Sequence, residues 1–189
     1  MGSSVTVRLA RDDERETARA LLAAAYAQYE EALPPENWRR YRADILDLEG
    51  RSGTSDLLVA ELDGAIVGCV NYYPPGLEVS YPSDSFSEPW PREWSAFRLL
   101  AVDPSARGLG IGRALTEECL ARSRAQGAPA VGLHTTPFMN VARALYERMG
   151  FRRAPAYDFH PAPTILVEAY CLELEQELRT QSAAPTGDQ

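Results

Sequence analysis

Three glycines stand at alternate positions in the stretch RGLGIGRAL, residues 107–115, with Arg107 before them and Arg113 after them. Glycine at this density disfavours the interior of a strand or a helix, which indicates a specialised turn. A glycine-rich turn before a helix points backbone N–H groups at an anion, and the helix dipole adds positive charge. The stretch therefore predicts a phosphate-binding loop; a turn that is glycine-rich only for tight packing is the alternative.

Two widespread phosphate loops do not fit this spacing. The Walker A loop ends in Gly-Lys-Ser/Thr, and this loop has no lysine. The dinucleotide-binding fingerprint has a third glycine at the position of Arg113 and an acidic residue after the next strand, which AVGLHT (residues 130–135) does not supply. We therefore expect neither ATP hydrolysis nor nicotinamide chemistry.

The charge balance of the chain limits its partners. The 189 residues carry a formal net charge of -8, and 45% of them are hydrophobic. Such an acidic globular protein is not expected to bind nucleic acid nonspecifically or to dock on an anionic membrane. The balance suits a cationic partner, although a solvated acidic surface explains it equally well.

The cysteines indicate a reducing compartment. Cys69, Cys119 and Cys171 are widely spaced within apolar segments and show no metal-ligand pattern. We expect free thiols, no metal cofactor and a cytoplasmic location. No apolar run is long enough for a transmembrane helix, and no signal-peptide pattern is found.

The first half of the chain predicts two helices and a hairpin. Asp13 and Glu16 form a capping-box pattern, and Asp63-Gly64 between two alternating apolar runs is a strong hairpin signal. The predicted elements are a strand over 5–10, a helix from the capping box to about 33, a second helix over about 35–49, and strands over 57–62 and 65–73.

A segment without periodicity follows, and a regular pattern then resumes. The segment carries Tyr81, Phe86 and Trp90 beside Glu78, Asp84 and Glu88, so it is either a lid for an amine substrate, spanning about Tyr81 to Glu93, or a mobile surface loop. The later predicted elements are a strand over 96–103, a helix from 111 to a stop at Gly127, a strand over 130–135, a helix behind the Thr136-Pro137 cap that ends at Met149, an extended segment from 151, and a last strand over 164–174.

This order, β-α-α-β-β-β-α-β-α-β-β, predicts an α+β fold with a mixed, mostly antiparallel sheet flanked by helices in three layers. We expect one domain over residues 1–174. The tail over residues 175–189 has too few apolar residues to pack and is expected to be disordered.

Two motifs resemble those of one enzyme family. RGLGIG resembles the R/Q-x-x-G-x-G/A motif of the GNAT superfamily of acyl-CoA-dependent N-acetyltransferases. NVARALYERMGF, residues 140–151, is similar to the later N-x-x-A-x-x-L/F-Y-x-x-x-G-F signature of that family. The resemblance spans about residues 5–174 and implies the GNAT fold, with acetyl-CoA as cosubstrate.

The resemblance also implies the roles of particular residues. Main-chain amides at about Leu109 to Ala114 would hold the CoA pyrophosphate, the strand at Leu100 to Val102 would pair with the pantetheine arm, and Tyr146 would protonate the departing thiolate. The residues expected to contact the cofactor are Leu100, Ala101, Val102, Arg107, Gly108, Leu109, Gly110, Ile111, Gly112, Arg113, Ala114, Asn140 and Ala142.

The general base stays open at this point. Some members of the family carry a glutamate on the fourth strand at the position that is Ala96 here. Glu93 lies three residues earlier, and His134 at the end of the 130–135 strand titrates near neutral pH. Asp84, Glu88 or a chain of waters are further options.

The predicted activity is transfer of an acetyl group from acetyl-CoA directly to a primary amine of a small molecule or a peptide. An acyl-CoA-binding sensor without turnover is one alternative, because Ala96 replaces the glutamate. An acetyltransferase for protein N-termini or lysines is another. A homodimer is among the assemblies left open.

Overall fold

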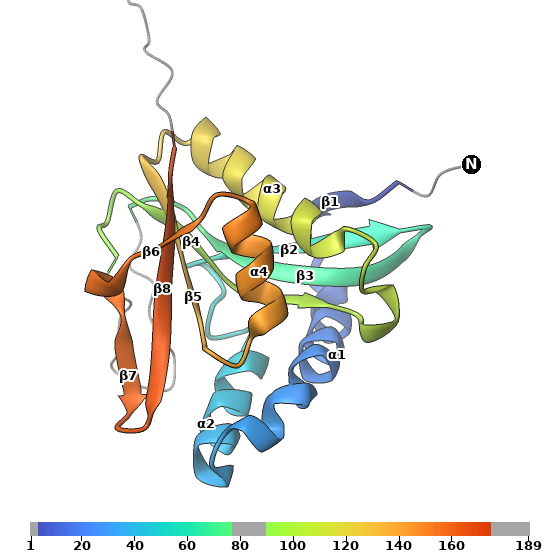
Figure 1. Cartoon of the computed structure of the whole chain (residues 1–189). Coiled ribbons are helices and arrows are strands. Elements are labelled where there is room, and N and C mark those ends of the chain that lie inside the picture. The colour runs from blue at the N-terminus through green and yellow to red at the C-terminus, as the bar shows by residue number, and fades with distance from the viewer. Residues whose placement is uncertain (1–3, 77–89, 175–189) are drawn as a thin grey trace, which may run out of the picture.

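A mixed sheet runs through the centre of the computed structural model, which describes residues 4–76 and 90–174 (Figure 1). Within these ranges the sheet has eight strands in the order β1-β2-β3-β4-β5-β8-β6, with β7 paired to β8. The strands are β1 Thr6–Leu9, β2 Asp56–Leu62, β3 Ala65–Tyr73, β4 Ser95–Val102, β5 Ala130–Thr135, β6 Arg152–Arg153, β7 Phe159–Ala162 and β8 Ile165–Glu173. Among the strand pairs of the described residues, only β4–β5 is parallel.

Helices cover both faces of this sheet, so the predicted three-layer α+β architecture is confirmed. Figure 1 shows α1 (Arg15–Tyr26) and α2 (Pro35–Leu46) on one side and α3 (Ile111–Ala125) on the other. The short α4 (Asn140–Arg148) packs with α3. Alternation along β2 divides the core, because Leu58 joins the α3 cluster and its neighbour Val59 joins the α1–α2 cluster.

Several local predictions are confirmed. Asp63 and Gly64 both have positive φ, 50° and 83°, as a two-residue hairpin turn between β2 and β3 requires. Along α3, Ile111, Leu115 and Cys119 are all buried, as their helical spacing indicates. Gly127 follows the helix with a φ of 73°, which is the conformation of a glycine stop.

The start of the first helix differs from the prediction. The Asp13–Glu16 capping box is wrong: the backbone N–H of Arg11 donates to Glu14 Oε2 at 2.7 Å, two residues earlier in the chain. Glu16 pairs with Arg19 on the helix surface. The two helices are also shorter than expected, since α1 gives way to 3-10 turns over Ala27–Ala32 and α2 ends at Leu46.

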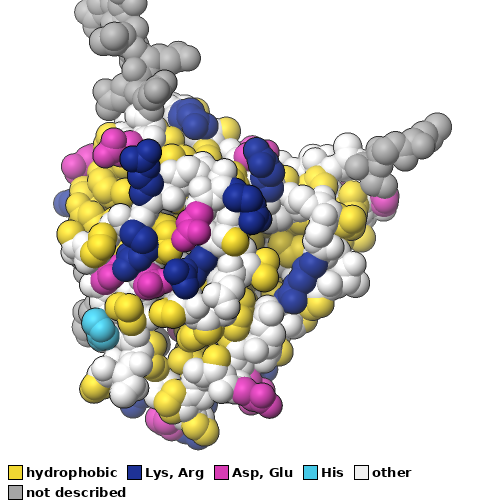
Figure 2. Space-filling view, viewed as in Figure 1, with side chains coloured by type: hydrophobic (Ala, Val, Ile, Leu, Met, Phe, Trp, Pro, Cys, Tyr) yellow, Lys and Arg dark blue, Asp and Glu magenta, His cyan; other side chains and the backbone are white. Residues whose placement is uncertain are grey.

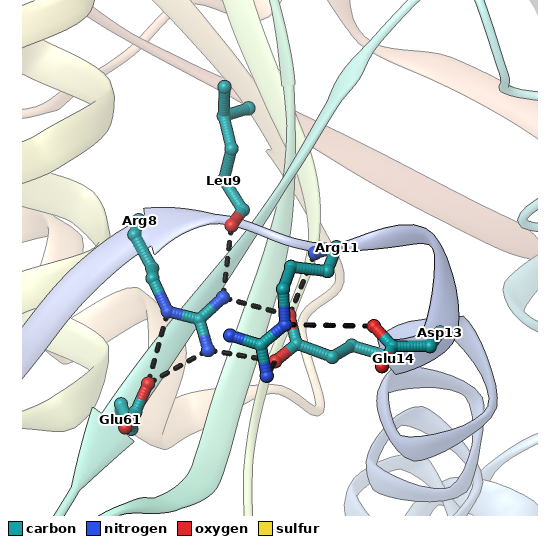
Figure 3. A network of polar contacts seen from close by, with 6 residues as sticks. All are labelled: Arg8, Leu9, Arg11, Asp13, Glu14 and Glu61. Atoms are coloured by element: carbon teal, nitrogen blue, oxygen red, sulfur yellow. Dashed lines mark hydrogen bonds and ion pairs between the residues drawn. The ribbon is translucent and has the colours of Figure 1, made fainter.

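Figure 3 shows why Glu14 takes the capping role. Its carboxylate accepts hydrogen bonds from both terminal nitrogens of Arg8, at 2.8 Å each. Arg8 also contacts Glu61 Oε2 at 2.8 Å. The network joins β1, the turn before α1, and β2. The Arg8 guanidinium lowers the pKa of Glu14 to about 2, so this buried carboxylate stays charged.

Two later boundaries also differ. Helix α4 begins at Asn140 and not after Thr136, because residues 136–139 form a turn closed by the Met139 N–H to the Thr136 carbonyl. The extended segment from residue 151 forms two short strands, β6 and β7, both paired to β8. The turn between them contains Pro155, which cannot donate a ladder hydrogen bond.

Strand β4 contains the irregularity that shapes the functional region. Its pairing with β3 shifts between Cys69 and Asn71, so Leu99 and Leu100 occupy the space opposite one residue. Leu99 has a φ of 56°, a strained value for a leucine inside a strand. Beyond the bulge β4 leaves β5, since the two strands pair only at Ser95–Val131 and Ala96–Gly132.

Candidate active site

A cavity of about 610 Å³ opens where β4 and β5 diverge. Its walls come from α1, α2, the bulged half of β4, the glycine loop with the start of α3, the end of β5, α4 and the β7–β8 hairpin. The divergence leaves one edge of β4 beyond Ala96 without β5 as a partner. An extended ligand could pair with that edge as a strand would.

The glycine loop lies at this cavity. Gly108 and Gly110 both have a φ of 80°, and Gly110 is the cap residue of the 15-residue helix α3. Ile111, Gly112 and Arg113 follow in its first turn, where amide groups have no intrahelical acceptor. The fit to an anion is therefore good: a long helix begins at the cavity wall, behind glycines that no side chain could replace without strain.

Ala114 is the exception among the predicted pyrophosphate-binding amides. Its N–H donates to the Gly110 carbonyl at 3.0 Å, inside the helix. Ala114 is also absent from the cavity wall, as is the more than half-exposed Leu109. The structure thus argues against a contact through the Ala114 amide, because the first turn of the helix has already used it.

The two arginines of the loop both line the cavity and both have partners. Arg107 donates to the Ala25 carbonyl near the end of α1 and to Gln28 Oε1 in the 3-10 turn that follows, at 3.4 Å each. Arg113 pairs with Glu117 one turn along α3, at 2.8 Å. These contacts hold two cationic side chains beside the loop.

The predicted pantetheine-binding residues Leu100, Ala101 and Val102 also line the cavity, immediately after the bulge. The Tyr26 hydroxyl donates to the Leu100 carbonyl at 3.5 Å and so ties α1 to this part of β4. In α4, Ala142 lies in the cavity wall, whereas Asn140 is exposed at the start of the helix and outside that wall.

Tyr146 is buried on α4 and lines the same cavity. Its ring packs edge-on against Phe97 and Phe151, with centroids 5.8 Å away in each case. Burial raises the pKa of Tyr146 above its ordinary value of 10. The phenol is therefore protonated at neutral and mildly alkaline pH, which is the form that an acid requires.

The candidates for the base fall in different places. His134 lines the cavity, and its Nε2 lies 2.9 Å from the Tyr157 carbonyl. Glu93 is exposed in a turn closed by Trp94 and Pro91, outside the cavity wall. Asp84 and Glu88, together with most of the predicted lid, lie outside the described residues.

A tryptophan covers the position of Ala96 in β4. Ala96 is buried opposite Gly132 of β5, and Trp90 packs on Ala96 and Tyr73. A Cβ on Gly132 would lie 2.6 Å from the Trp90 ring. Because Ala96 and Gly132 are small, the Trp90 indole packs directly on them. The indole would cover a glutamate side chain at position 96.

Trp90 belongs to a larger aromatic group around His134. The Trp90 ring lies 4.6 Å from the histidine ring and 5.7 Å from Trp94, and the Phe159 ring lies edge-on to His134 at 4.9 Å. These rings contact the imidazole and orient it in the structure. A carbonyl can only accept, so the contact with Tyr157 places a hydrogen on Nε2 and makes Nδ1 the proton-accepting nitrogen.

A row of polar residues on α2 was not predicted from the sequence. Asn37, Arg40, Tyr41 and Asp44 stand at helical spacing and all line the cavity. The signal was an i, i+3, i+4, i+7 pattern of polar side chains inside a helix, beside the buried Trp38 and Ile45. Asp44 is buried and meets Arg98 of β4 at 3.2 Å, a contact that no local pattern could reveal.

The charges along the wall differ from those of the whole protein. Among the described residues, five arginines and one aspartate line the cavity, although the net charge of the chain is -8. Figure 2 shows the face that bears α4, on which dark-blue cationic and magenta acidic side chains stand among yellow apolar ones. The expectation of a cationic acceptor rested partly on acidic residues between 78 and 88, which lie outside the described residues.

Two further findings concern membranes and metals in the described residues. None of their helices is long and apolar enough to span a membrane. No group of three or more His, Cys, Asp or Glu side chains in the described ranges is placed to hold a metal ion.

Comparison with known proteins identifies the family of this chain. The model of the acetyltransferase (GNAT) family matches residues 18–151. A mycothiol acetyltransferase from Cellulomonas flavigena is 36% identical over 138 residues, which are 71% of this chain and 36% of that protein. The chain thus spans about a third of the length of this relative.

Solved structures agree on the fold. An acetyltransferase of the GNAT family from Staphylococcus aureus Mu50 has a TM-score of 0.61 at 15% identity, covering 91% of this chain and all of the other. A GNAT family acetyltransferase from Brucella melitensis, solved in complex with acetyl-CoA, has a TM-score of 0.56 at 22% identity and covers 91% of this chain and 89% of the other. Motifs, fold and family match together place this chain in the acetyltransferase (GNAT) family of enzymes.

Proposed function

We propose that this protein transfers the acetyl group of acetyl-CoA directly to the primary amine of a small molecule. The observation that carries the proposal is a single cavity lined by the glycine loop, the start of α3, Tyr146 and His134. Donor binding and proton transfer can therefore take place in one enclosure. The relatives named as mycothiol acetyltransferases and the solved complex with acetyl-CoA support the same reading.

The donor would be held mostly by main chain. The first-turn amides of Ile111 to Arg113 would face its pyrophosphate, with Arg107 and Arg113 adding positive charge. The free edge of β4 at Leu100 to Val102 would pair with the amide groups of the pantetheine arm. A β4 N–H beside the bulge would then stabilise the negative charge that develops on the carbonyl oxygen.

The acceptor's nitrogen would attack the carbonyl carbon as a neutral amine and form the amide bond while the carbon–sulfur bond breaks. His134 is the group we assign to remove the excess proton from that nitrogen, through Nδ1. As the ring lies, Nδ1 is buried, so acceptor binding has to move the ring or its neighbours. Glu93 is less suited, because it is exposed outside the cavity wall.

Tyr146 would donate its phenolic proton to the departing sulfur. A phenol whose pKa is raised by burial is a weak acid, yet the sulfur leaves in the same dry surroundings. Burial raises the pKa of the Cys69 thiol in this core, and a thiolate that leaves beside Tyr146 would be affected by burial in the same direction, so the two effects oppose each other.

Thiol release from acetyl-CoA over a broad panel of primary amines tests the proposal. We expect turnover with at least one small amine, and we expect His134→Gln to lower kcat/KM by about 100-fold. His160→Gln is the matched control, since the other histidine is exposed on β7 outside the cavity wall. The chain contains no lysine, so background thiol release cannot come from acetylation of its own lysine side chains.

Other outcomes would favour the alternatives. Binding of CoA at the loop without thiol release for any amine would favour a sensor. Turnover restricted to proteins or long peptides would favour a protein acetyltransferase. An unchanged rate in His134→Gln would leave proton removal to water.

A further inference from the structure

The part of the cavity between α2 and β4 is built around a buried ion-pair group. Asp44 on α2 contacts Arg51 through Oδ1 at 2.6 Å and Arg98 of β4 through Oδ2 at 3.2 Å. The Arg51 guanidinium also donates a hydrogen bond to the Asp47 carbonyl, so Arg51 is anchored within the loop after α2. All three charged side chains are at least nine-tenths buried.

Asp44 and Arg98 reach the cavity, whereas Arg51 lies behind them. Since each oxygen of Asp44 already accepts from a guanidinium, this carboxylate is poorly placed to act as a base or to bind an ammonium group. Its effect is to fix the orientation of Arg98. A guanidinium can keep one contact with a carboxylate and still bind an oxyanion, because its planar fork carries five N–H donors.

Arg98 is placed at the point where acceptor and donor would meet. It immediately precedes the bulge at Leu99 and the Leu100–Val102 edge. Arg40 lines the same part of the cavity one helical turn before Asp44 on α2. Among the described residues, the charged side chains of the cavity wall between α2 and β4 are Arg40, Asp44 and Arg98. Asp44 is shared between Arg98 and Arg51.

We propose that Arg98, held by Asp44 and assisted by Arg40, recognises a carboxylate on the acceptor, so that the preferred acceptor is an amine that carries an anionic group, as amino acids and short peptides do. This inference rests on the proposed acetyltransferase function and narrows its substrate class. Arg98 would orient the acceptor so that the amine faces the free edge of β4 and the carboxylate faces α2.

The test compares acceptors that differ only in this charge: leucine with leucinamide, and glycylglycine with glycylglycinamide, each with saturating acetyl-CoA. Amidation lowers the amine's pKa and so raises the fraction of neutral nucleophile, which favours the amide. We nevertheless expect kcat/KM to be about 100-fold higher for at least one of the two acids than for its amide. Acids and amides used equally well would overturn the proposal.

Variants then identify the residue. Arg98→Gln should remove most of the preference by lowering kcat/KM for the acid about 100-fold, with less than about 3-fold change for the amide and for the KM of acetyl-CoA. Arg98→Lys should retain part of the preference for the acid over the amide. Arg39→Gln is the matched control, because Arg39 adjoins Arg40 on α2 and shares Glu36 as a partner but lies outside the cavity wall.

The outcomes remain distinct from failure of the proposed function. An equal loss for acid and amide in Arg98→Gln would make the residue structural and overturn the proposal. If that variant does not fold, Arg40→Gln and the comparison of acid with amide in the unaltered protein still decide the matter. Absence of thiol release with every amine would instead refute the acetyltransferase function itself.

Discussion

Tyr146 combines two properties that rarely coincide in a structural tyrosine. Its ring is buried between Phe97 and Phe151, yet the residue lines a cavity. Burial raises its pKa, so the hydroxyl keeps its proton through the range in which acceptor amines become neutral. A protonated phenol at the cavity wall is what thiolate departure requires.

Replacement of Tyr146 by phenylalanine should separate binding from chemistry. We expect Tyr146→Phe to lower kcat by about 10- to 100-fold, since general-acid assistance is lost while the ring packing is kept. The dissociation constant of CoA, measured by calorimetry, should change less than about 3-fold. An unchanged kcat would remove the acid role from this residue.

Gly110 offers a second test at the scale of one residue. Its φ of 80° strains any other side chain by about 1 kcal/mol, although no neighbouring atom would obstruct a Cβ. Gly110→Ala should raise the KM of acetyl-CoA by about 5-fold or more, because the loop must shift to relieve the strain.

Gly53→Ala is the matched control for that variant. Gly53 has a φ of 86° and equally open surroundings, but it lies outside the cavity wall. Both variants should lose similar stability in thermal unfolding. A raised KM in the Gly53 variant would show that backbone strain acts globally and not through the loop.

At the scale of elements, the contact between Gly132 and the Trp90 ring restricts which residues the β4–β5 junction can accept. A Cβ on Gly132 would approach the Trp90 ring to 2.6 Å, and the indole cannot yield without leaving Ala96 and His134. Gly132→Ala should therefore cost about 1–3 kcal/mol and shift the tryptophan fluorescence to longer wavelength. In a Trp90→Ala background the same change should cost little, and an undiminished cost there would contradict the explanation.

The junction of β1, α1 and β2 should respond to acid. Arg8 lowers the pKa of Glu14 from 4.5 to about 2, so the folded protein holds this carboxylate charged more strongly than the unfolded chain does. The stabilisation is present above about pH 4.5 and is lost as the pH falls toward 2.

Glu14→Gln should lower the Tm by about 5 °C at pH 6 and by progressively less below pH 4.5. Glu16→Gln is the control, because its pair with Arg19 is exposed on the first turn of α1 and should contribute little at any pH. A deficit in the Glu14 variant that does not vary with pH would exclude the ionic cause.

At the scale of the whole molecule, an acidic protein encloses a cationic cavity. The chain carries a net charge of -8, while five of the six charged residues that line the described cavity are arginines. An anionic donor is repelled by the surface at a distance and attracted at the mouth, so local contacts dominate its affinity.

Salt should therefore weaken donor binding in spite of the overall charge. Raising sodium chloride from about 50 to about 500 mM should increase the KM of acetyl-CoA by about 3- to 10-fold, because the exposed arginines at the mouth are screened. Arg148→Gln should reduce that dependence, since Arg148 is exposed and lines the cavity. A KM that falls with salt would show that the surface charge dominates.

The sequence by itself determined the features that depend on neighbours in the chain. The hairpin at Asp63-Gly64, the strand–loop–helix order around RGLGIG and the buried stripe of α3 follow from local φ preferences and helical periodicity. These features were sufficient to place the glycine loop at the start of a helix and Tyr146 on a later one. They also carried the family resemblance.

Only the tertiary structure decided which residues meet in the proposed acceptor-binding part of the cavity. Asp44 and Arg98 are 54 residues apart and meet because α2 packs against the bulged part of β4. Trp90 packs on Ala96 and Gly132, which the pairing of β4 with β5 brings side by side. Glu93 is exposed in a turn that has no periodic pattern in the sequence. Contacts of this kind arise from the packing of distant elements, which no short window of sequence encodes.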